Sequence, residues 1–178
     1  MKIKKNMLLL FLINFMTILN ACEKFKSLDD ELILNKTSYT NDQLRIDGYY
    51  YTQIRDIYII YFLYRDGILA SGGHVFENEL NEYEEMYRDG SFWNAKKDKK
   101  LYWGLFNIDS DKIMIEKWYP SSGGGMPAYL HSGEILNDTT FIITKSIRLK
   151  TGEEKELYET YHFKQFSPKP DSTNNFIK

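Results

Sequence analysis

The chain has 178 residues, of which 43% are hydrophobic and 27% are charged, and its net charge is −2. This composition is typical of one globular domain and argues against a disordered, collagen-like or multi-span membrane protein. A negative net charge also argues against a nucleic-acid-binding protein, which normally carries a strongly basic surface. The 14 Tyr, 11 Phe and 3 Trp residues favour strands over helices.

Residues 1–21 have the pattern of a secretory signal peptide. Lysines at positions 2, 4 and 5 are followed by a mostly apolar run over 7–19. As a helix this run is about 20 Å long, which is too short for a hydrocarbon core of roughly 30 Å. A charged start, a short apolar core and a small residue before the cut predict export and removal of residues 1–21.

The sequence Leu19-Asn20-Ala21-Cys22 resembles the lipobox of bacterial lipoproteins. The resemblance implies cleavage before Cys22 and lipid on both its thiol and its new amino group, which gives a stable membrane anchor. Cys22 is the only cysteine, so it forms no internal disulfide, and lipidation explains an unpaired exported thiol. By the same resemblance, Glu23 differs from the aspartate that retains some lipoproteins at the inner membrane, so we expect an outer-membrane location. An ordinary cleaved signal and an uncleaved anchor are the alternatives.

The lipidated cysteine and a mostly polar tether are expected over residues 22–43. Within them, Asp29-Asp30-Glu31 resembles the acidic export signals that send some bacterial lipoproteins to the cell surface. A solvated charge cluster is the alternative interpretation, so the periplasmic face and the cell surface both remain open. At the other end, residues 167–178 contain two prolines and are predicted to be an extended tail.

Between these ends, residues 44–166 form short apolar and aromatic segments separated by turn signals, a pattern typical of an all-β domain. The expected strands cover 44–52, 57–64, 68–76, 101–108, 113–119, 129–136, 139–149 and 155–166. Asp66-Gly67 predicts a tight turn between the second and third strands. The segment 57–64 is apolar or aromatic at every position, which implies burial on both of its faces.

One amphipathic helix is expected between the third and fourth strands, over 78–89. Its apolar residues Leu80, Tyr83 and Tyr87 recur at helical spacing, and Gly90 is placed to end it. Packed on the outside of the sheet or across one end, this helix would cover the second face of the apolar segment 57–64.

Sequential hairpins predict an antiparallel meander, and eight strands can close it into a barrel without exposed edges. Such a barrel is either filled by side chains or holds one small ligand. The meander, with Gly48-Tyr49-Tyr50 on its first strand where lipocalins carry Gly-x-Trp, resembles a lipocalin-like or calycin-type barrel. The predicted fold class is therefore a mainly β, eight-stranded meander closed into a lipocalin-like barrel, with one inserted helix.

No nucleophile elbow, phosphate-binding loop or helical metal motif occurs in the sequence, so we expect a non-enzymatic protein without a cofactor or metal. His74, His131 and His162 fall on three different expected strands, where polar faces are the simpler explanation. Glu116 and Glu134 stand in apolar surroundings on adjacent expected strands and are the best candidates for a hydrolytic pair. Pairing with Lys117 or Lys145 at a sheet surface is the alternative.

Tyrosine and tryptophan side chains are too numerous to be buried fully by strand alternation in one small domain. Because they combine an apolar body with a polar tip, they suit a ligand cavity or a surface that stacks on sugars. The predicted ligand-binding residues are Tyr50, Tyr58, Trp103, Trp118 and Tyr129. Trp103 and Trp118 flank one hairpin at positions that could face each other.

These observations predict a lipid-anchored envelope protein that binds a small apolar or amphipathic molecule, or a glycan, in an aromatic-lined barrel. The alternative is a structural or interaction subunit of an outer-membrane complex, with a filled barrel and a protein partner on its outer surface. A hydrolase is the third interpretation and needs two convergent carboxylates or a histidine cluster.

Overall fold

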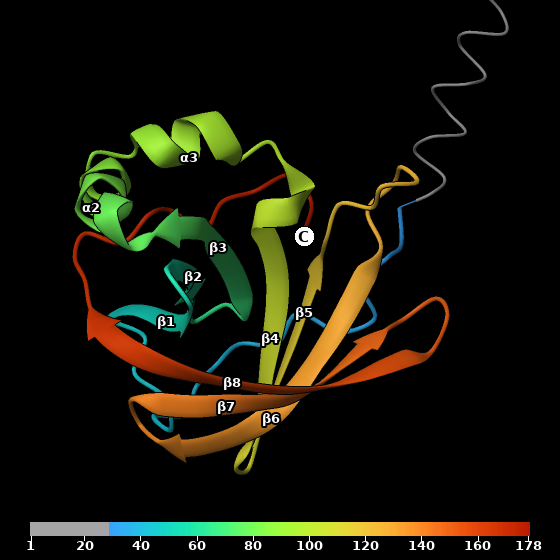
Figure 1. Cartoon of the computed structure of the whole chain (residues 1–178). Helices are drawn as coiled ribbons and strands as arrows, with labels where there is room; N and C mark the ends of the chain where they lie inside the picture. The colour runs from blue at the N-terminus through green and yellow to red at the C-terminus, as the bar shows by residue number, and fades with distance from the viewer. Residues whose placement is uncertain (1–28) are drawn as a thin grey trace, which may run out of the picture.

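The computed structural model describes residues 29–178, so the expected signal peptide and Cys22 lie outside the described residues. Eight antiparallel strands form a closed barrel in the order of the sequence (Figure 1). The barrel closes where the last strand pairs with the first, with Tyr50 opposite Phe163. The prediction of a mainly β, eight-stranded antiparallel barrel is confirmed.

The strands are joined mostly by short turns. They are β1 (Gly48–Ile54), β2 (Ile57–Leu63), β3 (Ile68–Phe76), β4 (Trp103–Asp109), β5 (Lys112–Trp118), β6 (Ala128–Asn137), β7 (Thr140–Arg148) and β8 (Glu153–Gln165). At the predicted turn between β2 and β3, Gly67 has a φ of 81°, a conformation that costs glycine little.

Helices connect β3 to β4, as predicted. They are η1 (Glu77–Glu79), α2 (Leu80–Arg88), α3 (Ser91–Lys96) and η2 (Lys100–Tyr102). The predicted helix corresponds to η1 and α2, while α3 is too short to show a helical period in the sequence. Gly90, with a φ of 77°, lies between α2 and α3.

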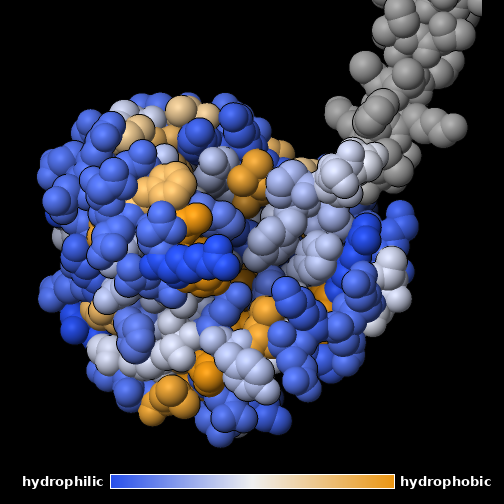
Figure 2. Space-filling model, in the orientation of Figure 1, coloured by the Kyte–Doolittle hydropathy of each residue, from blue (hydrophilic) through white to orange (hydrophobic). Residues whose placement is uncertain are grey.

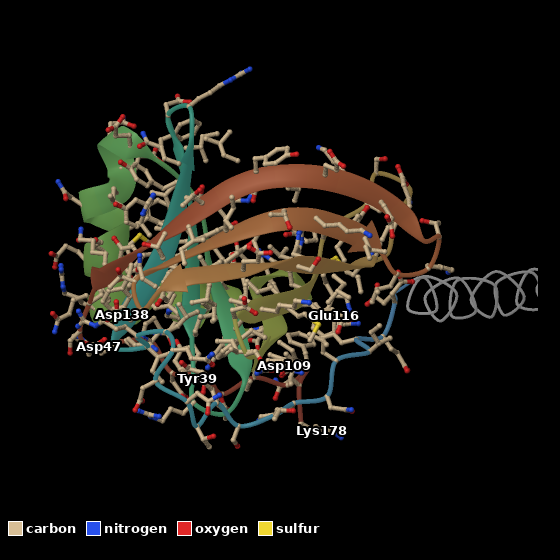
Figure 3. All side chains as sticks on the ribbon, turned by 90° about the horizontal axis from the view of Figure 1, so that it is seen from below. Tyr39, Asp47, Asp109, Glu116, Asp138 and Lys178 are labelled. Carbon is tan, nitrogen blue, oxygen red and sulfur yellow. The ribbon has the colours of Figure 1, made fainter. Side chains whose placement is uncertain are left out.

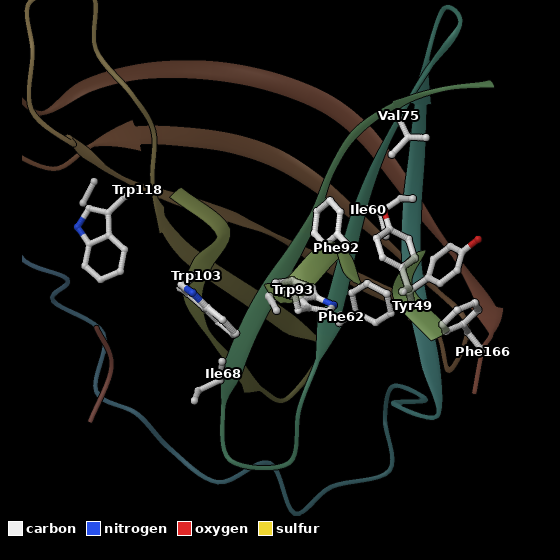
Figure 4. Packing of buried hydrophobic residues seen from close by; sticks show 13 residues of the cluster. Tyr49, Ile60, Phe62, Ile68, Val75, Phe92, Trp93, Trp103, Trp118 and Phe166 are labelled. Carbon is white, nitrogen blue, oxygen red and sulfur yellow. The ribbon is translucent and has the colours of Figure 1, made fainter. Parts of the chain in front are cut away.

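Strand alternation divides the hydrophobic core into two clusters. On β2, Ile60 and Phe62 point outward and pack with Tyr87 and Trp93 of the helices (Figure 4). The intervening Tyr61 belongs to the cluster inside the barrel. The apolar segment of β2 is therefore buried on both faces, as the sequence indicates, and the helices cover the outer one.

The described N-terminal residues lie against the barrel. They begin beside the loop between β5 and β6, and Asp29 accepts a hydrogen bond of 2.8 Å from the backbone N–H of Met126 (Figure 1). Tyr39 is buried in the inner cluster, and its N–H donates to the carbonyl of Arg65 at the turn between β2 and β3. This segment therefore covers the barrel end that carries that turn.

The C-terminal residues also pack on the barrel. Lys169 donates from Nζ to the carbonyl oxygens of Ile46 and Leu63, at 2.6 Å each. Tyr64 donates from its hydroxyl to the carbonyl of Pro170 at 2.8 Å.

Figure 2 shows one face of the molecule, which is mostly hydrophilic with scattered apolar side chains.

Candidate ligand-binding cavity

A cavity of about 300 Å³ lies inside the barrel. Its walls are formed by Ile59, Tyr61, His74, Tyr119, Tyr129, His131, Ser146, Lys155, Leu157, Glu159 and Tyr161. This volume is at the lower end of the range for small-molecule sites. It equals the space of about ten water molecules in the liquid, so it has room for a small ligand.

Strand register explains why these residues share the inner surface. His74 lies opposite Ile59 on β2, and Ser146 lies opposite both His131 and Lys155. Residues directly opposite each other on neighbouring strands point to the same face of the sheet. The cavity walls are therefore the inward face of β2, β3, β6, β7 and β8.

The cavity occupies one half of the barrel. Tyr119 follows directly on β5, Tyr129 is near the start of β6, and Lys155 is near the start of β8, so all three lie toward the end with the β5–β6 loop. The opposite half is filled by those residues of the inner cluster that do not line the cavity, among them Tyr50, which donates from its hydroxyl to the carbonyl of Asp138 at 3.0 Å. One half is thus hollow and the other is solid.

Lys117 is a buried cation at the inner surface of β5. It is only 4% exposed and lies opposite Tyr129 on β6. Its Nζ lies 5.1 Å from the ring centre of Tyr61 and 4.9 Å from that of Tyr119. Burial lowers the pKa of Lys117 to about 7. Among residues 29–178, no carboxylate forms an ion pair with this side chain.

Gly104 makes room for this lysine on the neighbouring strand β4, where it lies opposite Lys117. A Cβ at Gly104 would stand 2.8 Å from the Cβ of Lys117 and would also press on the carbonyl oxygen of Glu116. Any residue larger than glycine at position 104 would therefore clash with the side chain of Lys117.

Two of the three histidines face the cavity. Nε2 of His131 lies 3.0 Å from the hydroxyl of Tyr119, within hydrogen-bonding distance. Burial and the nearby charge of Lys117 lower the pKa of His131 to about 4, and the same two causes lower the pKa of His74. Both rings are therefore neutral at about pH 7. His162 is exposed on the other face of β8, next to Tyr51.

Three phenol groups supply hydroxyls to the same wall. Tyr61 stacks on Tyr161 with ring centres 5.2 Å apart, and Tyr161 donates to Oε2 of Glu159 at 3.2 Å. Burial raises the pKa values of Tyr61, Tyr119 and Tyr161 well above their ordinary value. These hydroxyls therefore stay protonated and can donate hydrogen bonds.

Of the five predicted ligand-binding residues, Tyr129 lines the cavity. Tyr50 points inward but belongs to the filled half. Tyr58 is partly buried on the outer face, with its ring centre 5.5 Å from that of Tyr51. Neither Tyr50 nor Tyr58 borders the cavity.

Trp103 and Trp118 also lie outside the barrel (Figure 4). Leu105 and Glu116 are opposite each other on the outer face, and the two indoles share the parity of these residues. Trp103 donates from Nε1 to the carbonyl of Lys97, and Trp118 donates to the carbonyl of Asp30, both at 2.7 Å. The two tryptophans cover the β4–β5 hairpin from outside and do not line this cavity, because the strand face that carries them points away from the barrel interior.

The two candidate carboxylates are not brought together. Glu116 is fully buried on the outer face and accepts the backbone N–H groups of Ile33 and Leu34, at 2.8 and 2.6 Å (Figure 3). Its pKa is raised, because burial outweighs these two hydrogen bonds. Glu134 is exposed and lies opposite Lys112.

The expected partners of these carboxylates are also engaged elsewhere. Lys117 points into the barrel, since successive strand residues point to opposite faces. Lys145 forms an ion pair of 2.7 Å with Glu154. The interpretation that Glu116 and Glu134 pair with Lys117 or Lys145 at a sheet surface is therefore wrong.

The described part of the chain offers no three His, Cys, Asp or Glu side chains positioned to hold a metal ion together. Within residues 29–178, no helix has both the length and the apolar character needed to cross a membrane. No family model, curated protein or solved structure matches the chain.

Proposed function

We propose that this protein binds one small, mainly apolar ligand inside its barrel and does not transform it. The supporting observation is the cavity of about 300 Å³ on the inner face of five strands. The rings of Tyr61, Tyr119, Tyr129 and Tyr161 offer apolar faces, while their hydroxyls can orient a polar group of the ligand. A few polar groups in a mostly apolar concave site are typical of small-molecule binding.

The volume narrows the range of ligands. A cavity that holds about ten water molecules accepts roughly as many non-hydrogen atoms. A medium-chain amphiphile or a single aromatic ring with a short chain meets this limit. An oligosaccharide exceeds it, so a small amphipathic molecule is favoured over a glycan.

We also propose that the barrel is held at the outer membrane through lipid on Cys22, because of the lipobox-like sequence that ends there. Only residues 23–28 separate Cys22 from Asp29, and this length of chain reaches about 25 Å at most. Asp29 is fixed at the β5–β6 loop and pairs with Lys100 at 2.9 Å. A lipid on Cys22 would keep the hollow end of the barrel near the bilayer, where amphipathic ligands partition.

Ligand binding can be measured on a soluble chain of residues 23–178. All eight strands and both core clusters lie within this chain, so it keeps every contact described above. We expect micromolar to millimolar binding of medium-chain or phenylalkyl amphiphiles by calorimetry, with NMR shifts at Tyr129 and His131.

Two variants separate cavity binding from adsorption to the surface. Ser146→Leu adds volume on the inner wall and should weaken binding at least tenfold. Trp103→Phe alters only the outer cluster and should leave binding unchanged. Equal binding to the Ser146→Leu variant, or no binding across the panel, would contradict the proposal. Co-purification of a stoichiometric envelope protein by a chain that binds no ligand would instead favour the structural-subunit alternative.

The membrane anchor has its own test, which is mass spectrometry of the native protein. A diacylglyceryl group and an acyl chain on an N-terminal Cys22 are expected. An intact N-terminal methionine would contradict the anchor without affecting the proposal on ligand binding.

A further inference from the structure

We propose that the ligand is a small amphipathic carboxylate, an inference that rests on the proposed function. Its headgroup is held beside Lys117, and its apolar part lies among the tyrosine rings of the cavity. This lysine lies on the inner face of the barrel, between Gly104 and Tyr129 of the two neighbouring strands.

The ammonium group of Lys117 lies directly behind the cavity wall. Its nitrogen is about equally far from the rings of Tyr61 and Tyr119, at 5.1 and 4.9 Å, and both rings line the cavity. The faces of these rings attract the cation but provide no negative charge. An anion that enters between the two rings would therefore meet an ammonium that no described carboxylate neutralises.

Other charged residues on the inner face add to the positive charge around the cavity. Lys155 lines the cavity, and Arg148 lies opposite Tyr129 with its Nε buried and without a hydrogen-bond partner among residues 29–178. The acidic residue of the wall is Glu159, which accepts a hydrogen bond from Tyr161. Glu153 lies opposite Arg148 but is exposed, at the start of β8. Cationic groups therefore outnumber acidic ones around the cavity.

A carboxylate is the complement that this arrangement lacks. A buried charge without a counterion is unfavourable, whereas a charge-assisted hydrogen bond to a carboxylate compensates it. The protonated hydroxyls of Tyr61 and Tyr119 provide further donors for the same oxygens. The lowered pKa of Lys117 fits this role, since a bound anion would favour its protonated form.

Three ligands with eight carbon atoms each test the charge preference on the soluble chain, namely octanoate, octan-1-ol and octylamine. At about pH 6.5, below the pKa of Lys117, we expect octanoate to bind at least tenfold more tightly than octan-1-ol. Octylamine should bind more weakly than the alcohol. Calorimetry in buffers of different ionisation enthalpy should show proton uptake on octanoate binding at about pH 7.5.

Lys117→Met keeps the length of the side chain and removes its charge. In this variant octanoate should lose at least tenfold in affinity, while octan-1-ol should bind within about twofold of the original value. Lys155→Met is the matched control, because it removes an exposed lysine from the wall of the same cavity. The control should keep most of the preference for octanoate.

A direct measurement on the unmodified chain complements the variants. The ¹³Cε resonance of Lys117 should report a pKa that octanoate raises by more than one pH unit and that octan-1-ol leaves unchanged. Equal affinities for octanoate and octan-1-ol, or a preference that persists in Lys117→Met, would overturn the assignment of the carboxylate while cavity binding stands. Failure of all three ligands to bind would count against the proposed function itself.

Discussion

The side-chain nitrogen of Lys117 lies 4.9 Å from the ring centre of Tyr119. Tyr119 in turn lies within hydrogen-bonding distance of His131, so a cation, a phenol and an imidazole meet on one wall of the barrel. Burial makes the lysine a weak base and keeps the imidazole neutral. Apolar side chains would pack at these positions without burying polar groups. The buried lysine, phenol and imidazole therefore have measurable effects on the stability of the fold.

Lys117→Met should stabilise the protein at neutral and acidic pH. The folded-state pKa of Lys117 is about 7 against an ordinary value of 10.5, so between these values the unfolded chain binds more protons than the folded one. The lysine therefore destabilises the fold at about pH 7 and below, by up to about 5 kcal/mol, and this penalty fades as the pH rises.

Urea unfolding of both chains between about pH 6 and pH 9 measures this effect. The stability difference should shrink by about 1.4 kcal/mol per pH unit above pH 7. Above about pH 10 the ionisation of tyrosine in the unfolded state lowers the stability of both chains alike, so it leaves the difference between them unchanged. A difference that does not vary with pH would show that Lys117 is not a depressed base in the folded chain.

His131 should make the fold sensitive to acid. Its folded pKa of about 4 is below the ordinary 6.5, so the stability that it contributes as a neutral group is present above about pH 6.5. This contribution is lost as the pH falls toward 4, and it amounts to up to about 3 kcal/mol. His131→Gln should remove this pH dependence in denaturant unfolding, whereas His162→Gln, at an exposed outer position, should retain it. Identical acid profiles for the two variants would contradict the assignment.

Much of the barrel can be predicted because its signals are local. The Asp66-Gly67 turn, the apolar β2 segment and the helical spacing from Leu80 each depend on a few neighbouring residues. Once most connections are short, adjacent strands pair and the meander follows. Closure of the meander is expected because it removes the exposed edges of the first and last strands, and the pairing of β1 with β8 confirms it.

The contents of the cavity are harder to predict, because they depend on which face of each strand turns inward. The β4–β5 hairpin is apolar on both faces, so the sequence shows that Trp103 and Trp118 share a face but not that this face is outside. A bulge between Ile60 and Tyr61 shifts the register of β2 against β3. Helix α3 then covers the outer indole of Trp103, with Trp93 at a ring distance of 5.4 Å.

The inward position of Lys117 could have been predicted from the sequence. On the strand Ile113 to Trp118, the residues Ile113 and Ile115 have the same parity as Lys117, and both are buried in the inner cluster. A lysine in phase with core residues indicates an inward cation. Reading Lys117 as the partner of its neighbour Glu116 overlooks that adjacent strand residues point to opposite faces.

Glu84→Gln should loosen helix α2 from the barrel. Oε1 of Glu84 accepts hydrogen bonds of 2.5 Å from the hydroxyl of Tyr49 and 2.6 Å from Nζ of Lys164, so one carboxylate joins α2 to β1 and β8. Burial raises its pKa, but these two hydrogen bonds outweigh that effect and the pKa is lowered. The stabilisation is thus present above about pH 4.5 and is lost as the pH falls further.

The expected cost of Glu84→Gln is about 2 kcal/mol in denaturant unfolding, reduced from that of a fully buried pair because Lys164 is partly exposed. Glu85→Gln on the same helix is the control. Its ion pair with Arg88 is at the surface, so the loss should stay below about 0.5 kcal/mol. Equal losses in both variants would argue against a clamp by Glu84.

Glu116→Gln should release the N-terminal segment while the barrel stays folded. The carboxylate accepts the N–H groups of both Ile33 and Leu34, and an amide offers only one oxygen and turns its NH₂ group toward the second donor. The unpaired group costs about 1–3 kcal/mol, so hydrogen exchange at these two amides should accelerate at least about fivefold. Exchange at Ile115, inside the β5 ladder, should not change. Glu134→Gln, on the exposed surface of the neighbouring strand, should leave all of these rates unaltered. Slow exchange at residues 33 and 34 in the Glu116→Gln chain would mean that other contacts hold this segment on the barrel.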